Sequence, residues 1–122
     1  MRRPLLFLFS IIINGHFSFG QDLNSLSTEL KNHPQEDTVR INLILDICSK
    51  NYAFVPEENK VYAEEVLRIS KKIGYQQGIG FATRYIALYY WAISDYGQAT
   101  HYAYEMLRIF EDLSMGHNEI SS

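Results

Sequence analysis

Residues 61–69 read VYAEEVLRI and residues 101–109 read HYAYEMLRI, so that six of nine positions are identical at an offset of 40. Self-similarity with a period of about 20 to 50 residues is typical of repeat proteins, whose units bury their apolar faces against their neighbours. The repeated stretch therefore predicts stacked units rather than one closed core.

The second unit is predicted to be a pair of antiparallel helices. Residues 76–93 show helical spacing with apolar side chains on two sides, as expected of a helix that packs on two sides. Residues 94–97 form a short polar break in which Asp95 is expected to cap the second helix. That second helix carries one apolar face at helical spacing, made of Ala99, Tyr102, Ala103, Met106, Leu107, Phe110 and Leu113.

One series of residues in this unit matches a known repeat pattern. The series is Ile86-Ala87, Tyr90, Asp95-Tyr96, Ala99, Tyr102-Ala103 and Leu107. It resembles a tetratricopeptide repeat (TPR), which sets a Leu-Gly/Ala pair and a Tyr on helix A, a Gly-Asp-Tyr turn, and small residues on helix B. Ser94 departs from this pattern at the turn Gly, and the period of about 40 exceeds the usual 34 or so. The resemblance implies an all-α, TPR-like α-solenoid of antiparallel helix hairpins, similar to the long repeats of bacterial regulators and sensors.

Outside the second unit, helix-breaking residues and changes in the apolar pattern divide the chain into segments. Leu23, Leu26 and Leu30 predict a short helix with one apolar face, which ends before Pro34 because the residue preceding a proline disfavours helical dihedrals. We expect this helix to cover the exposed face of the first repeat. The expected segments are a signal peptide (1–20), a capping helix and linker (21–36), a first TPR-like repeat (37–74), a second (75–115) and a polar tail (116–122).

Capping residues predict the helix ends. Asp37 is expected to cap helix A of the first repeat, Pro56 to begin its helix B and Gly74 to end that helix. The glycine-rich stretch 74–80 has the spacing of neither a dinucleotide loop nor a P-loop, and we expect it to link the two repeats. Gly116 is expected to end the last helix.

The first 20 residues have the features of an export signal. Arg2 and Arg3 precede an apolar run at 5–13, and Ser18 and Gly20 supply small residues for a signal peptidase. The alternative is an uncleaved anchor, but the run is short of the roughly 20 residues that span a bilayer. The sequence predicts a secreted or periplasmic protein with no membrane span in its mature part.

Composition and spacing give no sign of catalysis. The formal net charge of −3 provides no reason to expect nucleic acid or anionic lipid as a partner. The single cysteine, Cys48, excludes an internal disulfide, matches Ala87 in the second unit, and is expected to be a small packed residue rather than a reactive thiol. The histidines lack metal-ligand spacing, and no nucleophile has a recognisable base. We expect no enzyme, no cofactor and no metal.

The candidate site is the concave face that helix A of each repeat would present on the side away from helix B. Aromatic and arginine side chains there are typical of a protein-binding surface. The alternative is that these side chains pack against an adjoining repeat. The expected residues are Asn42, Leu45, Ser49 and Tyr52 in the first repeat, and Phe81, Arg84, Leu88 and Trp91 in the second.

The predicted function is non-catalytic binding of a protein or peptide by an exported repeat scaffold. The resemblance implies an alternative, a truncated or remnant sensory segment of a TPR-containing histidine kinase or transcription regulator. Two repeats are fewer than the roughly three that stacked units need for independent stability. We therefore expect the open side of the second repeat, with Tyr85, Tyr89 and Tyr104 exposed, to make the chain marginally stable or dimeric.

Overall fold

Most of the part that the computed structural model describes is helical. This part is residues 22–51 and 56–121, with the side chains of Pro56 and of residues 117–121 excepted. The helices are α2 (Leu23–Lys31), α3 (Thr38–Lys50), α4 (Pro56–Ile73), α5 (Gln76–Ala92) and α6 (Tyr96–Ser121), and these ranges contain no strand. The all-α prediction is confirmed. The expected signal peptide and the site residue Tyr52 lie outside the described residues.

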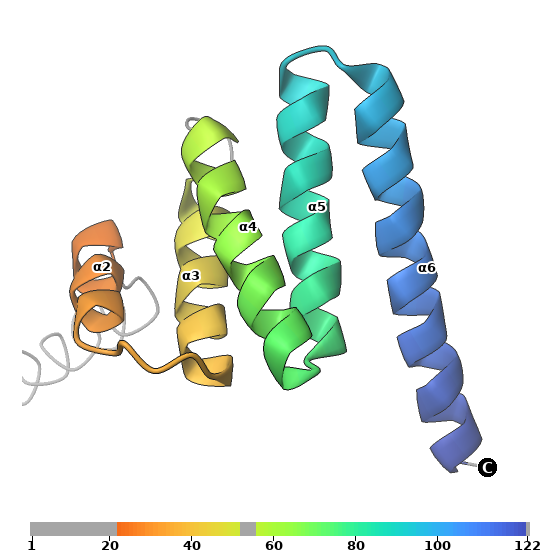
Figure 1. The fold of residues 1–122 in the computed structure, drawn as a ribbon, viewed down its shortest axis with the longest axis horizontal. Helices are drawn as coiled ribbons and strands as arrows, with labels where there is room; N and C mark the ends of the chain where they lie inside the picture. Colours follow the sequence, from red (N-terminus) through yellow and green to blue (C-terminus); the bar gives the residue numbers. More distant parts are fainter. Residues whose placement is uncertain (1–21, 52–55, 122) are drawn as a thin grey trace, which may run out of the picture.

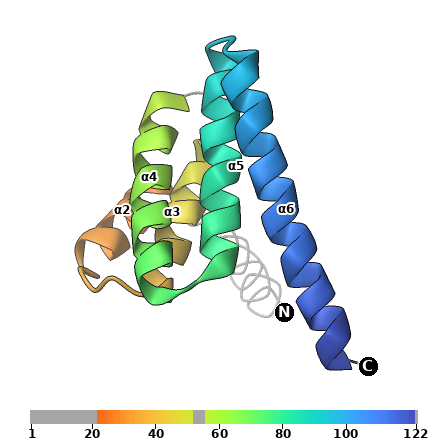
Figure 2. The same ribbon diagram turned by 45° about the vertical axis from the view of Figure 1, so that its right-hand side comes forward.

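Each helix from α3 onward runs antiparallel to the one before it and packs against it (Figure 1). The short α2 packs against α3, and α5 contacts both α3 and α4. Figure 2 shows that α6 lies beside α5 and extends past the first turn of that helix. None of the described helices is long and apolar enough to cross a bilayer.

Aspartates begin three of the helices, since a carboxylate accepts a hydrogen bond from an otherwise unpaired N–H of the first turn. Asp22 accepts from the Ser25 amide at 2.8 Å, and Asp37 accepts from the Arg40 amide at 3.0 Å. In the turn before α6, Asp95 accepts from the Gln98 amide at 3.2 Å. The predicted caps at Asp37 and Asp95 are confirmed.

Two helices end at a residue in the left-handed region. Gly74 follows α4 with φ +74°, and Ser94 follows α5 with φ +65°. In both turns the next amide donates to a carbonyl five residues earlier, Tyr75 to Ser70 at 2.8 Å and Asp95 to Tyr90 at 2.9 Å. This is the bond of a Schellman cap, for which glycine is preferred because it has no Cβ. Gly74 is confirmed as a cap, and Ser94 occupies a position that favours glycine.

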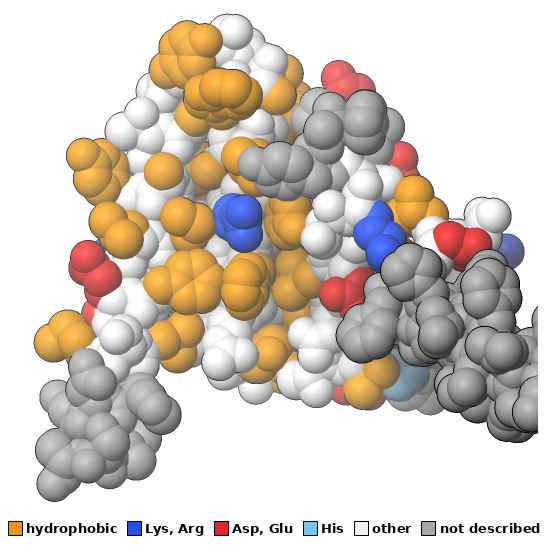
Figure 3. Space-filling model, turned by 180° about the vertical axis from the view of Figure 1, so that it is seen from behind, with side chains coloured by type: hydrophobic (Ala, Val, Ile, Leu, Met, Phe, Trp, Pro, Cys, Tyr) orange, Lys and Arg blue, Asp and Glu red, His pale blue; other side chains and the backbone are white. Residues whose placement is uncertain are grey.

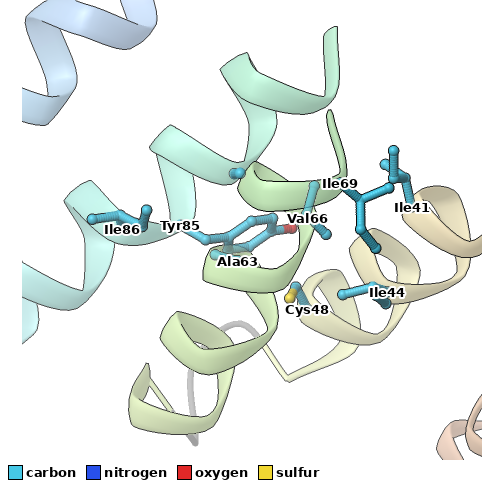
Figure 4. Packing of buried hydrophobic residues seen from close by; sticks show 9 residues of the cluster. Ile41, Ile44, Cys48, Ala63, Val66, Ile69, Tyr85 and Ile86 are labelled. Atoms are coloured by element: carbon cyan, nitrogen blue, oxygen red, sulfur yellow. The ribbon is translucent and has the colours of Figure 1, made fainter. Parts of the chain in front are cut away.

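The core lies where α3, α4 and α5 meet. Figure 4 shows Tyr85 reaching from α5 across α4 toward Val66. Tyr85 is 8% exposed, so the prediction that it lies on the open side was wrong. At about 1.5–3 kcal/mol for each large apolar side chain buried, this contact is the main stabilising junction. The buried cluster is Ile41, Ile44, Cys48, Ala63, Val66, Ile69, Ala82, Tyr85 and Ile86.

Two glycines near the start of α5 allow close packing of neighbouring helices. A Cβ at Gly78 would lie 2.1 Å from Oγ of Ser70, and a Cβ at Gly80 would lie 2.8 Å from the Phe110 ring. Both glycines lie inside α5, so the expected linker is reduced to the turn at Gly74 and Tyr75. The close spacing between α4 and α5 depends on the absence of a side chain at Gly78.

The end of the chain differs from its prediction. The helix α6 continues to Ser121, so Gly116 lies within it and 116–121 is helical. Gly116 does not adopt a positive φ, in contrast to Gly74. The residue that matches Gly74 at the repeat offset of 40 is Ser114, which has no left-handed cap and does not turn the chain. The last helix is therefore longer than α4, its counterpart in the first repeat.

Candidate partner-binding groove

A groove of about 520 Å³ runs between α5 and α6. Hydrophobic side chains gather over these two helices on the face drawn in Figure 3. The walls are mostly apolar, and their polar groups are the side chains of Arg84 and Thr100, the Tyr96 hydroxyl and the Trp91 indole N–H. We call this feature the α5–α6 groove. Its lining residues are Arg84, Ala87, Leu88, Trp91, Tyr96, Ala99, Thr100, Ala103 and Met106.

Aromatic side chains stand at one end of the groove. Trp91, on the last turn of α5, is 64% exposed, and Tyr96, on the first turn of α6, is 59% exposed. Solvent exposure of so much aromatic surface in a hollow is unfavourable for the free protein and favours a partner that covers it. The groove therefore provides an anchor of the type found at the centre of protein interfaces.

Arg84 is the single charged residue in the groove lining. Its side chain is exposed, and within residues 22–51 and 56–116 it makes no ion pair or hydrogen bond. By contrast, the arginines of α3 and α4 form ion pairs. Arg40 contacts Glu65 at 2.8 Å, and Arg68 pairs with Glu36. Arg84 thus presents a free cation beside an apolar surface.

Three of the predicted site residues meet in this groove. Arg84, Leu88 and Trp91 line it as a group. Phe81 lies lower on α5, where its ring meets Phe110 edge to face at a centroid distance of 5.1 Å. The predicted orientation was wrong, because α6 forms the other wall and the residues do not face away from it.

The predicted residues of the first repeat do not form part of this groove. Asn42 and Ser49 are exposed on α3, whereas Leu45 packs against the buried cluster. The α6 wall was missed, although its small residues could have been recognised. Ala99, Thr100 and Ala103 recur on one side of α6, where they leave room beside α5.

A comparison of the two repeats shows that the groove is a covered position in the first repeat. Three fully buried residues there have counterparts that line the groove: Cys48 matches Ala87 at an offset of 39, and Ala63 and Val66 match Ala103 and Met106 at an offset of 40. The first three are 0% exposed, whereas Ala103 is exposed and Ala87 and Met106 are half-buried. The difference follows from α5, which covers the first set, whereas none of the described helices covers the second.

A second hollow, of about 720 Å³, lies between α2 and α4. Four of its charged residues form two ion pairs, Arg40 with Glu65 and Arg68 with Glu36. Arg40 donates to Glu65 and to the carbonyls of Leu30 and His33, and Glu36 accepts from Lys72 at 2.9 Å. These bonds hold α2 and its following loop against α3 and α4, which accounts for the charges structurally.

Cys48 lies under α5 and is inert by its surroundings. Burial, followed by the nearby carboxylate of Glu58, raises the pKa of its thiol to about 12. The thiolate is the reactive form, so the thiol does not act as a nucleophile near neutral pH. Within the described residues, no group of His, Cys, Asp and Glu side chains could hold a metal ion.

Comparisons with protein-family models, with characterised proteins and with solved structures found no similar protein.

Proposed function

We propose that the chain is a non-catalytic TPR-like scaffold that binds a protein or peptide in the α5–α6 groove. The observation that supports this proposal is the combination of an open, mostly apolar groove with Trp91 and the unpaired Arg84 on its wall. Tryptophan and arginine are enriched among the residues that dominate interface energies. The repeat in the sequence and the antiparallel helices support the TPR-like class.

The export signal supports binding outside the cytoplasm. The arginines at 2 and 3 and the apolar run at 5–13 are the features of a secretory leader. A sensory segment of a repeat-containing histidine kinase or regulator remains the alternative, and in that case the groove would receive another part of the signalling protein. In both hypotheses the partner binds in the α5–α6 groove. They differ in whether the partner is a separate protein or another part of the signalling protein.

Self-association is a second candidate role, and it concerns the exposed apolar side chains of α6. Tyr104, Leu107 and Met115 are 69%, 49% and 62% exposed there. Tyr89 contributes less than expected, because its ring is half-buried against Tyr90 at a centroid distance of 5.2 Å. Apolar surface of this kind favours association.

The test selects phage-displayed random peptides on the mature chain and measures their affinity for variants. Trp91→Ala should weaken binding by at least ~2 kcal/mol, as truncation of an aromatic anchor does. Because Trp91 is largely exposed, the helical circular dichroism should stay unchanged. Tyr104→Ala removes an exposed aromatic ring outside the groove and is the matched control.

Equal affinity of the selected peptides for the wild type and Trp91→Ala would exclude the groove as the binding site. Unfolding of Trp91→Ala would show that this residue belongs to the core and not to a binding surface.

A further inference from the structure

The helix α5 shows what kind of element this fold receives beside a helix pair. Ala82, Tyr85 and Ile86 stand at i, i+3 and i+4 and enter the cluster formed by α3 and α4. Tyr85 lies against the α4 surface, as Figure 4 shows. The small Ala82 lets the helix approach closely, while the larger Tyr85 and Ile86 one turn further on fill the hollow.

We propose that the α5–α6 groove receives an amphipathic helix from a partner protein, docked as α5 docks on α3 and α4, with an acidic side chain facing Arg84. This inference rests on the proposed function and specifies the partner. It is carried by the repeat, since residues that α5 covers in the first unit match residues that line the groove in the second.

The lining of the groove favours a helix over an extended peptide. An extended segment must pair its backbone N–H and C=O groups, and buried unpaired groups are costly. The polar groups of the lining are the side chains of Arg84 and Thr100 and, at one end, the Tyr96 hydroxyl and the Trp91 indole N–H. These are too few to pair every backbone group of an extended segment. A helix satisfies its own backbone and presents only its side chains. The small residues Ala87 and Ala103 on facing walls leave room for those side chains.

Arg84 is the reason for proposing an acidic residue on the partner helix. Its counterpart at an offset of 39 is Leu45, which packs against the buried cluster. A helix that covered the groove would remove Arg84 from water, and burial of an unpaired charge is strongly unfavourable. A carboxylate on the incoming helix would form a bidentate pair with the guanidinium and offset this cost.

The test uses peptides that copy residues 76–92, the helix that docks on the first repeat, with the peptide's own Trp91 replaced by Phe. The protein contains one tryptophan, Trp91, so a blue shift of its fluorescence reports peptide in the groove. One peptide set carries a single Glu at each position outside the stripe of Ala82, Tyr85 and Ile86. The matched set carries Lys at the same positions.

At least one Glu peptide should bind the wild type about ten-fold or more tightly than the matching Lys peptide. An attractive charge pair with Arg84 raises the affinity, whereas two like charges lower it. That preference should vanish in Arg84→Gln and persist in Arg108→Gln, which removes an exposed arginine of α6 outside the groove. The bound peptide should gain helical circular dichroism.

The inference and the proposed function fail in different ways. If the library-selected peptides bind in a Trp91-dependent way but the helical peptides do not, or if Glu and Lys peptides bind equally, the inference is overturned and the proposed function stands. If nothing shifts the Trp91 fluorescence or binds through Trp91, both are overturned. A dimer that covers Trp91 without added peptide would make a second copy the occupant and would also overturn the inference.

Discussion

Replacement of Gly78 by alanine tests whether α4 and α5 meet as closely as the structure shows. The added Cβ would lie 2.1 Å from Oγ of Ser70, 3.0 Å from Cβ of Ser70 and 2.9 Å from the Tyr75 ring. Ser70 is 0% exposed, and its hydroxyl has no hydrogen-bond partner among the described residues. Rotation of the hydroxyl would still leave Cβ of Ser70 and the Tyr75 ring too close to the new methyl group, so packed neighbours would have to shift.

Two opposing terms give the expected size of the effect. Alanine is favoured over glycine inside a helix by up to ~1 kcal/mol. Overpacking of a tight site costs about 1–3 kcal/mol, and a contact of 2.1 Å belongs at the upper end of that range. Gly78→Ala should therefore lower the free energy of unfolding by about 1–2 kcal/mol. For a domain of this size, that corresponds to a fall in Tm of roughly 4–8 °C for each kcal/mol.

A double-mutant cycle identifies the cause. Ser70→Ala removes a buried unpaired hydroxyl and should leave stability unchanged or raise it by about 1 kcal/mol. In the Ser70→Ala background, Gly78→Ala should lose part of its effect, because the 2.1 Å contact is gone while the contacts with Cβ of residue 70 and with the Tyr75 ring remain. Urea and thermal unfolding followed by circular dichroism give the four stabilities. A Gly78→Ala protein as stable as the wild type, or additive effects of the two changes, would refute the close approach of the helices.

Three further predictions concern the turn before α6, the Glu36 ion pairs and the exposed apolar side chains of α6. Ser94→Gly should raise the unfolding free energy by about 0.5–1 kcal/mol, since a φ of +65° strains any residue with a Cβ; a lower Tm would contradict this. Hydrogen bonds from Arg68 and then Lys72 hold the pKa of Glu36 at about 2, below its ordinary 4.5. The stability that the Glu36 ion pairs contribute is therefore complete above pH 4.5 and is lost as the pH falls toward 2. In Glu36→Gln, the free energy of unfolding should depend less on pH in that window. An unchanged pH dependence would argue against the pairing. If the exposed apolar side chains of α6 associate, Leu107→Glu should abolish any concentration dependence of sedimentation and Tm. A wild type that shows no such dependence is a stable monomer.

Local chemistry made the helix ends predictable. A carboxylate at Asp37 and a glycine at Gly74 act on backbone groups within a few residues, so their roles follow from the sequence alone. The burial of Cys48 was also predictable, because the repeat aligns it with a small residue. These features depend on spacing along one helix and not on how helices cross.

Features that depend on helix crossing were not predictable in the same way. Tyr85 and Tyr89 look equivalent in the sequence, but the angle at which α5 meets α4 buries Tyr85 with Ile86 and leaves Tyr89 half-buried. The same angle turns Arg84 and Trp91 toward α6 rather than away from it. A glycine such as Gly116 ends a helix only where it adopts a left-handed conformation and the chain turns, and α6 continues through it.

The most direct test of the account moves a thiol between two matching positions of the repeat. The wild type carries its one cysteine at Cys48, under α5, and the comparison protein carries Cys48→Ala together with Ala87→Cys, in the α5–α6 groove. The rate of labelling by a thiol reagent is measured for both under native conditions. We predict that Cys48 reacts only through unfolding, whereas the thiol at 87 reacts orders of magnitude faster. Equal protection of the two thiols in folded proteins would show that the groove is already covered, and would contradict the central claim that it is open to a partner.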